Sequence, residues 1–273
     1  MTARIPLAAT RALWSLAPLG LDELQADAAL HTRIDRKYVV DWAMFAELTE
    51  GLANSHRALE IDSRRTFRYE TVYFDSPALT AFRAHMQQRR RRYKARSRRY
   101  VDSGLHLFEV KLKGARDETI KHQLPYAADD HGRVTEQARA FLEARVAEAY
   151  PRMAVPTLAP TLRTDYERVT LAHGPERVTC DFALSFADAT GRMVPGLDPG
   201  HVILESKCER GLGAVDRALR TRGISPVSCS KYCVGVGLLR TDVKTNDLRW
   251  LLSRYFGAMP LGARAMAHGP AHA

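Results

Sequence analysis

The sequence contains no apolar run that approaches the ~20 residues needed for a membrane-spanning helix. The first thirty residues also lack a signal-peptide pattern, because the apolar segment 12–21 is short and is interrupted by Pro18 and Gly20. The 4 cysteines are too few for a disulfide framework, and Cys229 and Cys233 have no second close pair that would complete a zinc site. We therefore expect a cytoplasmic protein with reduced cysteines and no membrane segment.

Two further patterns are missing. Helix-like and strand-like segments do not alternate, although a parallel sheet needs a crossover connection after nearly every strand. No spacing of Ser, His and Asp residues suggests a nucleophilic catalytic site. The chain instead contains about eight strand-like runs and a few amphipathic helical segments, an order that favours an α+β fold with a largely antiparallel sheet.

Positive charge is abundant. The 273 residues include 41 Lys and Arg against 31 Asp and Glu, a net charge of +10, and the sequence pI is about 9.7. This balance indicates an anionic partner, such as nucleic acid, a phosphorylated metabolite, polyphosphate or an acidic membrane surface. Net charge by itself does not choose among them.

The densest charge lies at 89–113, where RRRRYKARSRRYVDSGLHLFEVKLK reads as two strands joined by a polar turn. Successive side chains of a strand point to opposite faces, so Lys94, Arg96 and Arg98 share one face. A solvated sheet face is the ordinary interpretation of such a row. However, like charges on one strand repel unless an anion or interleaved carboxylates compensate them. The row therefore suggests a polyanionic ligand.

The same alternation recurs along the other strand-like runs. Charged or hydrogen-bonding groups share one face, and apolar residues that helices must cover share the other. An open sheet with its charged face in water is one interpretation. A closed antiparallel barrel of about eight strands accounts for more, because its interior is wide enough for one slender ligand. Phosphates would compensate the enclosed cations, and Glu109, Asp181 and Glu205 are oxygen donors suited to a divalent ion.

Eight short motifs carry a resemblance to a known family. They are RIDRKY (33–38), YFDS (73–76), KARSR (94–98), EVKLK (109–113), YER (166–168), RVTCD (177–181), ESK (205–207) and SKY (230–232). In this order they resemble the VTC domain, the polyphosphate polymerase domain of the vacuolar transporter chaperone complex and its bacterial relatives. That domain belongs to the triphosphate tunnel metalloenzymes. The resemblance covers about residues 31–240.

The resemblance implies an eight-stranded antiparallel β-barrel that forms a tunnel, with helices packed outside. It implies transfer of the ATP γ-phosphate onto a polyphosphate chain, with Mn²⁺ or Mg²⁺ as cofactor. Its catalytic phosphate contacts correspond to Lys37, Arg96, Arg98, Arg168, Arg177 and Lys231. Lys94 and Tyr166 correspond to substrate-binding positions, and the metal-binding glutamate corresponds to Glu205. Alternation places Lys111, Lys113 and Lys207 on the same inward face, and we predict that they also bind substrate.

Three segments are predicted from the sequence: a helical lead-in at 1–30, the tunnel domain at 31–257 and a disordered tail at 258–273. Hydrolytic relatives within the tunnel superfamily begin with Glu-x-Glu-x-Lys, whereas this chain has Arg33, Asp35 and Lys37 at those positions. That replacement agrees with the polymerase branch. The regulatory domain and membrane helices of the eukaryotic polymerase subunits are not found in this sequence.

Three other functions remain open at this point. The same site with water as acceptor would make a tripolyphosphatase or nucleoside triphosphatase. A site without turnover would make a binding module for polyphosphate or nucleotides. Nucleic-acid binding on an open sheet is the last alternative, and we do not expect it, because single-strand binders need exposed aromatic stacking platforms that these charged rows largely lack.

Overall fold

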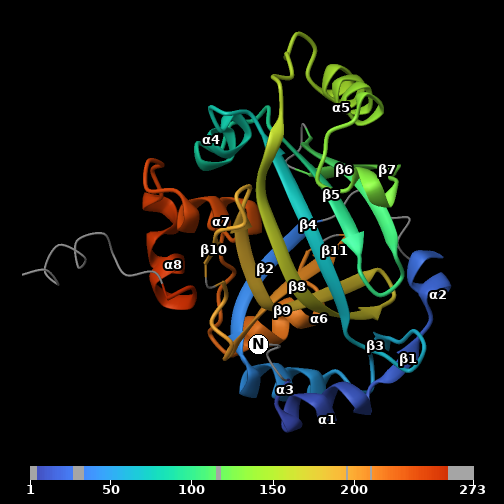
Figure 1. Cartoon of the computed structure of the whole chain (residues 1–273). Helices are drawn as coiled ribbons and strands as arrows, with labels where there is room; N and C mark the ends of the chain where they lie inside the picture. Colours follow the sequence, from blue (N-terminus) through green and yellow to red (C-terminus); the bar gives the residue numbers. More distant parts are fainter. Residues whose placement is uncertain (1–4, 27–33, 115–117, 195, 210, 258–273) are drawn as a thin grey trace, which may run out of the picture.

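One large β-sheet dominates the computed structural model, which describes residues 5–26, 34–114, 118–194, 196–209 and 211–257 (Figure 1). Its principal strands pair in the order β2-β11-β9-β8-β4-β5-β6-β7, and every ladder along this path is antiparallel. In chain order they are β2 (Ile34–Asp41), β4 (Phe67–Asp75), β5 (Tyr93–Tyr100), β6 (Leu105–Lys113), β7 (Thr119–Pro125), β8 (Ala159–His173), β9 (Glu176–Asp188) and β11 (His201–Cys208). The predicted α+β class with a largely antiparallel sheet is confirmed.

Three short strands extend this sheet. They are β1 (Ala17–Leu19), β3 (Arg57–Leu59) and β10 (Met193–Val194). Strand β10 pairs with β9, and β3 pairs with β8, both antiparallel. Strand β1 lies parallel to β3 and thereby ties the N-terminal segment to the sheet.

Eight α-helices and two short 3₁₀ helices lie in the described ranges. They are α1 (Leu7–Ser15), α2 (Leu21–Ala26), α3 (Trp42–Gly51), α4 (Thr80–Met86), η2 (Ala128–Asp130), α5 (Glu136–Ala149), α6 (Ala214–Thr221), α7 (Lys231–Leu239), η3 (Asn246–Leu248) and α8 (Arg249–Tyr255). Within those ranges, no helix is both long enough and apolar enough to cross a membrane.

Several predicted boundaries agree with local chemistry. Asp41 caps α3 as expected, because its carboxylate accepts a hydrogen bond of 2.8 Å from the Met44 backbone N. Thr135 caps α5 in the same way, accepting from the Ala138 N at 3.2 Å. The helix expected at 21–30 is described only as far as Ala26. The remainder of that helix, Arg33 of the first motif and the tail at 258–273 lie outside the described residues.

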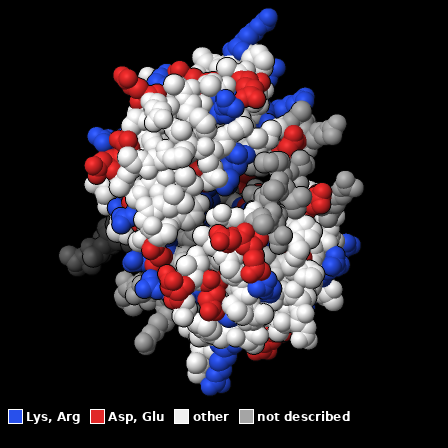
Figure 2. All heavy atoms as spheres, turned by 90° about the vertical axis from the view of Figure 1, so that its right-hand side faces the viewer, with Lys and Arg blue, Asp and Glu red and all other residues white. Residues whose placement is uncertain are grey.

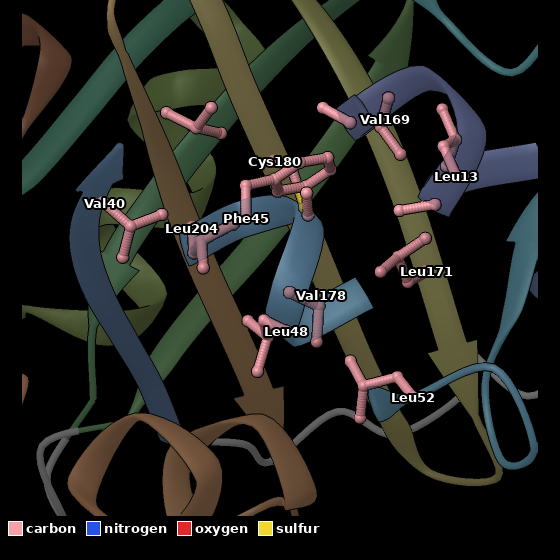
Figure 3. Close-up of a cluster of buried hydrophobic side chains, with 14 of the residues drawn as sticks. Leu13, Val40, Phe45, Leu48, Leu52, Val169, Leu171, Val178, Cys180 and Leu204 are labelled. Carbon is pink, nitrogen blue, oxygen red and sulfur yellow. The ribbon is translucent and has the colours of Figure 1, made fainter. Parts of the chain in front are cut away.

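The outer face of β2, β11, β9 and β8 is covered by α1, α3 and α6. Figure 3 shows Phe45 and Leu48 of α3 lying among Val40, Val178 and Leu204 from three neighbouring strands. Farther along the sheet, the outer faces of β4, β5 and β6 pack against α5 through a separate apolar cluster. The strands therefore bury one face under helices, as the alternation predicts.

Helix α7 lies on the opposite, inner face, and the sequence did not predict it. Its sequence, KYCVGVGLL, contains two glycines, which disfavour a helix. Packing explains its presence. A Cβ at Gly235 would lie 2.6 Å from both Leu162 Cδ2 and Phe186 Cδ1, so only glycine allows α7 to approach β8 and β9 this closely. Together with α8 it packs against Val39 and Ile203 in the inner apolar cluster.

The sheet path is open between its two end strands. Among the described residues, β2 and β7 are not paired with each other. The free edge of β2 instead receives the segment that leads into α7, because the Val227 backbone N donates to the Lys37 carbonyl O at 2.7 Å. The described strands therefore do not confirm the predicted closed eight-stranded barrel, and backbone pairing leaves a gap at this edge.

Candidate functional site

The inner face carries the charged residues of the strands in matching register. Lys37 of β2 lies opposite Glu205 of β11, which lies opposite Thr179 of β9. On the other half of the sheet, Arg96 of β5 lies opposite Glu109 of β6. Because residues paired across antiparallel strands point to the same side, these rows form one polar surface.

The first charged group centres on Glu205. Its Oε1 lies 2.9 Å from the Lys37 Nζ, and its Oε2 lies 2.5 Å from the Lys207 Nζ. Burial opposes ionisation of Glu205, but Lys207 and Lys37 hold its pKa well below the usual value. Burial also disfavours both ammonium groups; the Glu205 charge nevertheless raises the pKa of Lys37, whereas the pKa of Lys207 is lowered to about 8. Lys207 therefore releases its proton more readily than an ordinary lysine.

The second charged group centres on Glu109, which is fully buried. Arg96 donates from Nε to the Glu109 Oε2 at 2.6 Å, and the Arg98 Nη1 lies 3.8 Å from the same oxygen. Gln123 and Lys121 of β7 approach the other oxygen at 2.8 and 3.5 Å. Burial opposes its ionisation, yet the neighbouring guanidinium groups keep the pKa of Glu109 well below its usual value.

The third group joins three elements around Asp181 of β9. Arg168 of β8 donates to both carboxylate oxygens, at 2.6 and 2.8 Å, in a bidentate pair. Lys231, the first residue of α7, donates to Oδ2 of the same carboxylate. Burial raises the pKa of Asp181, but the charges of Arg168 and Lys231 lower it by more. The pKa therefore lies below the usual value for an aspartate. Helix α7 therefore contributes a cation to a site that is otherwise built from strands.

Two lysines on this face form no direct ion pair of this kind among the described residues, although the charges of Glu205 and Glu109 act on Lys111 from farther away. The Lys94 Nζ donates to the Ser230 Oγ at 2.9 Å, and neither Lys94 nor Lys111 pairs with a carboxylate in the part of the chain that the structure describes. Burial lowers the pKa of Lys94. Burial and the nearby Arg96 charge lower the pKa of Lys111 well below its usual value. An anion between these lysines would remove both penalties.

Aromatic rings and hydroxyl groups complete the surface. Tyr166 stacks on Tyr69 with ring centroids 5.2 Å apart, and the Lys231 Nζ lies 4.7 Å from the Tyr166 ring centroid. The buried hydroxyl groups of Thr164, Tyr166 and Thr179 have no hydrogen-bond partner among the described residues. An unsatisfied buried hydroxyl costs free energy, and phosphate oxygens would accept from all three.

Two predicted residues have described contacts outside these three groups. Arg177 faces Lys207 in the ladder, but its Nη2 donates to the Leu24 carbonyl O at 2.6 Å. Lys113 ends β6, where its backbone N donates to the Tyr150 Oη at 2.7 Å. The other predicted site residues come together on the inner face.

The chemistry of the surface follows from its charge balance. The three carboxylates are shared by a larger number of Lys and Arg side chains, so the surface keeps a net positive charge after internal pairing. Arg96 and Arg98 are only 7% and 6% exposed, which strengthens their attraction for a charged ligand. One face of the molecule is hollowed near its centre, and Lys or Arg atoms border the hollow (Figure 2). A linear polyanion suits such a surface.

A divalent metal ion fits this surface only if a bound anion supplies some of the atoms that coordinate it. The described residues contain no group of three or more His, Cys, Asp or Glu side chains that could hold a metal ion. Both oxygens of Glu205 already face lysines. However, Mg²⁺ is commonly held by one or two carboxylates together with substrate phosphates. A single glutamate therefore fits a divalent ion only where a bound anion supplies further oxygen ligands.

Three residues that bond to the charged side chains of this surface were not predicted from the sequence as site residues. Ser230 bonds Lys94, Lys121 approaches Glu109, and Tyr73 accepts from the Arg96 Nη1 at 3.2 Å. Ser230 and Tyr73 lie inside the quoted motifs, and Lys121 alternates with Gln123 on β7. Period-two alternation could have identified Lys121. No sequence signal indicates that Ser230 lies beside Lys94, because 136 positions separate them.

The family model described as the VTC domain matches residues 32–240. A search of curated proteins finds no match. Among solved structures, a candidate adenylate cyclase from Bacillus halodurans is 14% identical, with a TM-score of 0.41 over 73% of this chain and 94% of that chain. A candidate adenylyl cyclase from Hippeastrum, for which a dominant triphosphatase activity is stated, is 14% identical, with a TM-score of 0.41 over 75% and 95%. A protein from Pyrococcus horikoshii is 13% identical, with a TM-score of 0.38 over 71% and 91%.

Proposed function

Because the chain belongs to the VTC domain family, we propose that it is a phosphotransfer enzyme whose inner sheet face binds a triphosphate or polyphosphate chain. One observation carries the proposal: Lys94 and Lys111 lie opposite each other, half-buried, and form no ion pair with a carboxylate among the described residues, on a face that also holds unpartnered hydroxyl groups. A cation that is withdrawn from water without a paired carboxylate costs free energy unless a ligand neutralises its charge. A chain of phosphates supplies repeated negative charge along such a row.

The specific reaction that we propose is transfer of the ATP γ-phosphate onto a polyphosphate chain. Phosphoryl transfer needs mainly positioning and stabilisation of charge, and cations positioned on rigid strands supply both. The acceptor is a phosphate oxygen that is already ionised at neutral pH. The reaction therefore needs no serine or cysteine nucleophile.

The residues then have distinct roles. Arg96, Arg98 and Arg168 present planar guanidinium groups that can hold phosphate oxygens through two hydrogen bonds at once. The remaining predicted catalytic contacts to the phosphate chain come from Lys37, Lys231 and Arg177. Lys94, Lys111, Lys113, Tyr166 and Lys207 bind the remainder of the chain. Phosphate oxygens would replace Glu205 and Asp181 as partners of Lys37, Lys207 and Lys231, and would join Glu109 as partners of Arg96 and Arg98.

A divalent ion, Mn²⁺ or Mg²⁺, would be held by Glu205 together with phosphate oxygens. When bound, it would neutralise charge on the phosphate oxygens near the transferred group. In the absence of phosphates, Lys37 and Lys207 compete for the same carboxylate. We therefore propose that the ion enters with the substrate, once the phosphates have engaged these lysines.

We also propose that the site is a tunnel rather than an open face. The segment that binds the free edge of β2 through Val227 continues to Ser230, which bonds Lys94 of β5. This segment bridges the two halves of the sheet where backbone pairing leaves a gap. The cytoplasmic location remains a prediction of the sequence.

The decisive experiment is a product assay. The purified protein is incubated with ATP and Mn²⁺, and the products are separated by chain length. Long-chain polyphosphate supports the polymerase reaction, whereas free phosphate alone assigns water as the acceptor. Lys94→Met with Lys111→Met provides the matched variant, because it removes the two cations on which the proposal depends. Binding of tripolyphosphate that is unchanged in this double variant would contradict the proposed site.

A further inference from the structure

We propose that Asp75 and Tyr232 are positioning residues for Lys231, an inference that rests on the proposed function. The hydrogen bond between them sets the rotation of the first turn of α7. That rotation aims the Lys231 ammonium at Asp181 and at the phosphate chain that would replace it. Both residues lie inside quoted motifs, YFDS and SKY, but neither was predicted as a site residue, and their hydrogen bond joins them to each other rather than to the three inner carboxylates.

Asp75 is a rigid anchor at the end of β4. It is 1% exposed, and its Oδ1 accepts from the backbone N of Ser76 at 2.7 Å and of Ala81 at 2.9 Å. Its Oδ2 accepts from the Phe82 backbone N at 2.9 Å. Three backbone donors therefore fix this carboxylate to the strand and to the start of α4, so it can serve as a reference point for another element.

Tyr232 reaches that anchor from α7. Its hydroxyl donates to the Asp75 Oδ2 at 2.5 Å, although 157 positions separate the two residues. The ring packs between Tyr73, at a centroid distance of 5.2 Å, and Phe82, at 6.4 Å. Helices α4 and α7 consequently lie beside each other (Figure 1). The apolar contacts hold α7 in place, and the hydrogen bond selects one rotation of it.

Lys231 is the neighbour of Tyr232, and consecutive residues of a helix point about 100° apart. While Tyr232 points to Asp75, Lys231 points to Asp181 and lies over the Tyr166 ring. A small rotation of the helix would move both side chains together. Ser230, which caps α7 by accepting from the Cys233 N at 3.3 Å, is bonded by Lys94. The first turn of α7 is therefore where the alignment of the site is determined.

The test uses Tyr232→Phe, which removes one hydroxyl and keeps the ring. Tyr38→Phe is the matched control, because Tyr38 is also buried, also donates to a buried aspartate (Asp216 Oδ1, 2.9 Å) and also follows a site lysine. Tyr38, however, lies on β2, whose ladder with β11 fixes the backbone independently of that hydrogen bond. Both variants are measured in the full chain for thermal stability, amine labelling of Lys231 and calorimetric binding of tripolyphosphate.

We expect Tyr232→Phe to increase the labelling of Lys231 and to weaken tripolyphosphate binding by about tenfold, whereas Tyr38→Phe leaves both unchanged at a similar loss of stability. In a Lys231→Ala background, Tyr232→Phe should cause no further loss of affinity. Additive losses, or unchanged labelling of Lys231, would overturn the positioning role. If the wild-type protein does not bind tripolyphosphate, the proposed function is overturned. Increased labelling of Lys231 in Tyr232→Phe would then show the alignment without any role in binding.

Discussion

Lys94 of β5 and Ser230 at the start of α7 are joined by a hydrogen bond of 2.9 Å across 136 positions of sequence. The bond links the basic hairpin to the segment that occupies the free edge of β2. It places Lys94, a half-buried lysine without an ion-paired carboxylate among the described residues, beside the helix that supplies Lys231. The charged inner surface is therefore assembled by tertiary contacts between segments that lie far apart in the sequence.

The two sides of β5 should respond differently to neutralisation. Arg98 is 6% exposed on the inner face, whereas its neighbour Arg99 is exposed on the outer side. A charge-assisted contact contributes about 1.5–3 kcal/mol, so Arg98→Gln should weaken tripolyphosphate binding by about tenfold to hundredfold. Arg99→Gln should change it little. Equal losses in calorimetric titrations would show that the row acts only as a charged surface.

Glu205→Gln should separate turnover from binding. The substitution removes the carboxylate that we assign to the divalent ion but leaves Lys37 and Lys207 available to phosphates. Turnover of ATP with Mn²⁺ should be lost, whereas metal-free binding of tripolyphosphate should persist. Unchanged turnover in this variant would remove Glu205 from the metal site.

Lys207 should make binding dependent on pH. Burial, only partly offset by Glu205, lowers its pKa to about 8, so its ammonium group is charged below that pH and neutral above it. Affinity for tripolyphosphate should therefore fall as the pH rises from about 7 to about 9. Lys207→Met should bind more weakly at pH 7 and lose this part of the dependence. A variant with the wild-type pH profile would assign the titration to another group.

Glu109 should be important for stability. Replacing it with Gln leaves Arg96 and Arg98 buried without their carboxylate, and breaking a buried pair in this way costs about 3–5 kcal/mol. The free energy of unfolding is measured by urea denaturation. Asp242→Asn is the control, because Asp242 forms an exposed ion pair with Arg240, and solvent screens such a pair so that its loss changes stability little. Similar losses in both variants would contradict the buried role of Glu109.

The alternation of residue types predicted much of the site. Side chains in a strand change face at every residue, so Lys94, Arg96 and Arg98 had to share one side wherever the strand lay. The same reasoning placed Glu109 and Lys111 together on β6. The antiparallel α+β class followed from the order of the elements, and the structure confirms it.

Other features could not be read from periodicity. Helix α7 contains two glycines and was not predicted, because its stability comes from close packing on Leu162 and Phe186 rather than from helix propensity. Arg177 shares the inner row by register, yet its guanidinium group bonds the carbonyl of Leu24. Such outcomes depend on which elements happen to lie within reach of a long side chain.

The sequence by itself determined which chemical groups would share a face, because strand geometry requires only local alternation. Only the tertiary structure decided which cation meets which carboxylate, that Lys94 and Lys111 form no ion pair within the described ranges, and that Tyr232 reaches Asp75. Those outcomes depend on the pairing and curvature of distant strands. Contacts between residues more than a hundred positions apart arise from the packing of the whole chain and leave no periodic signal in the sequence.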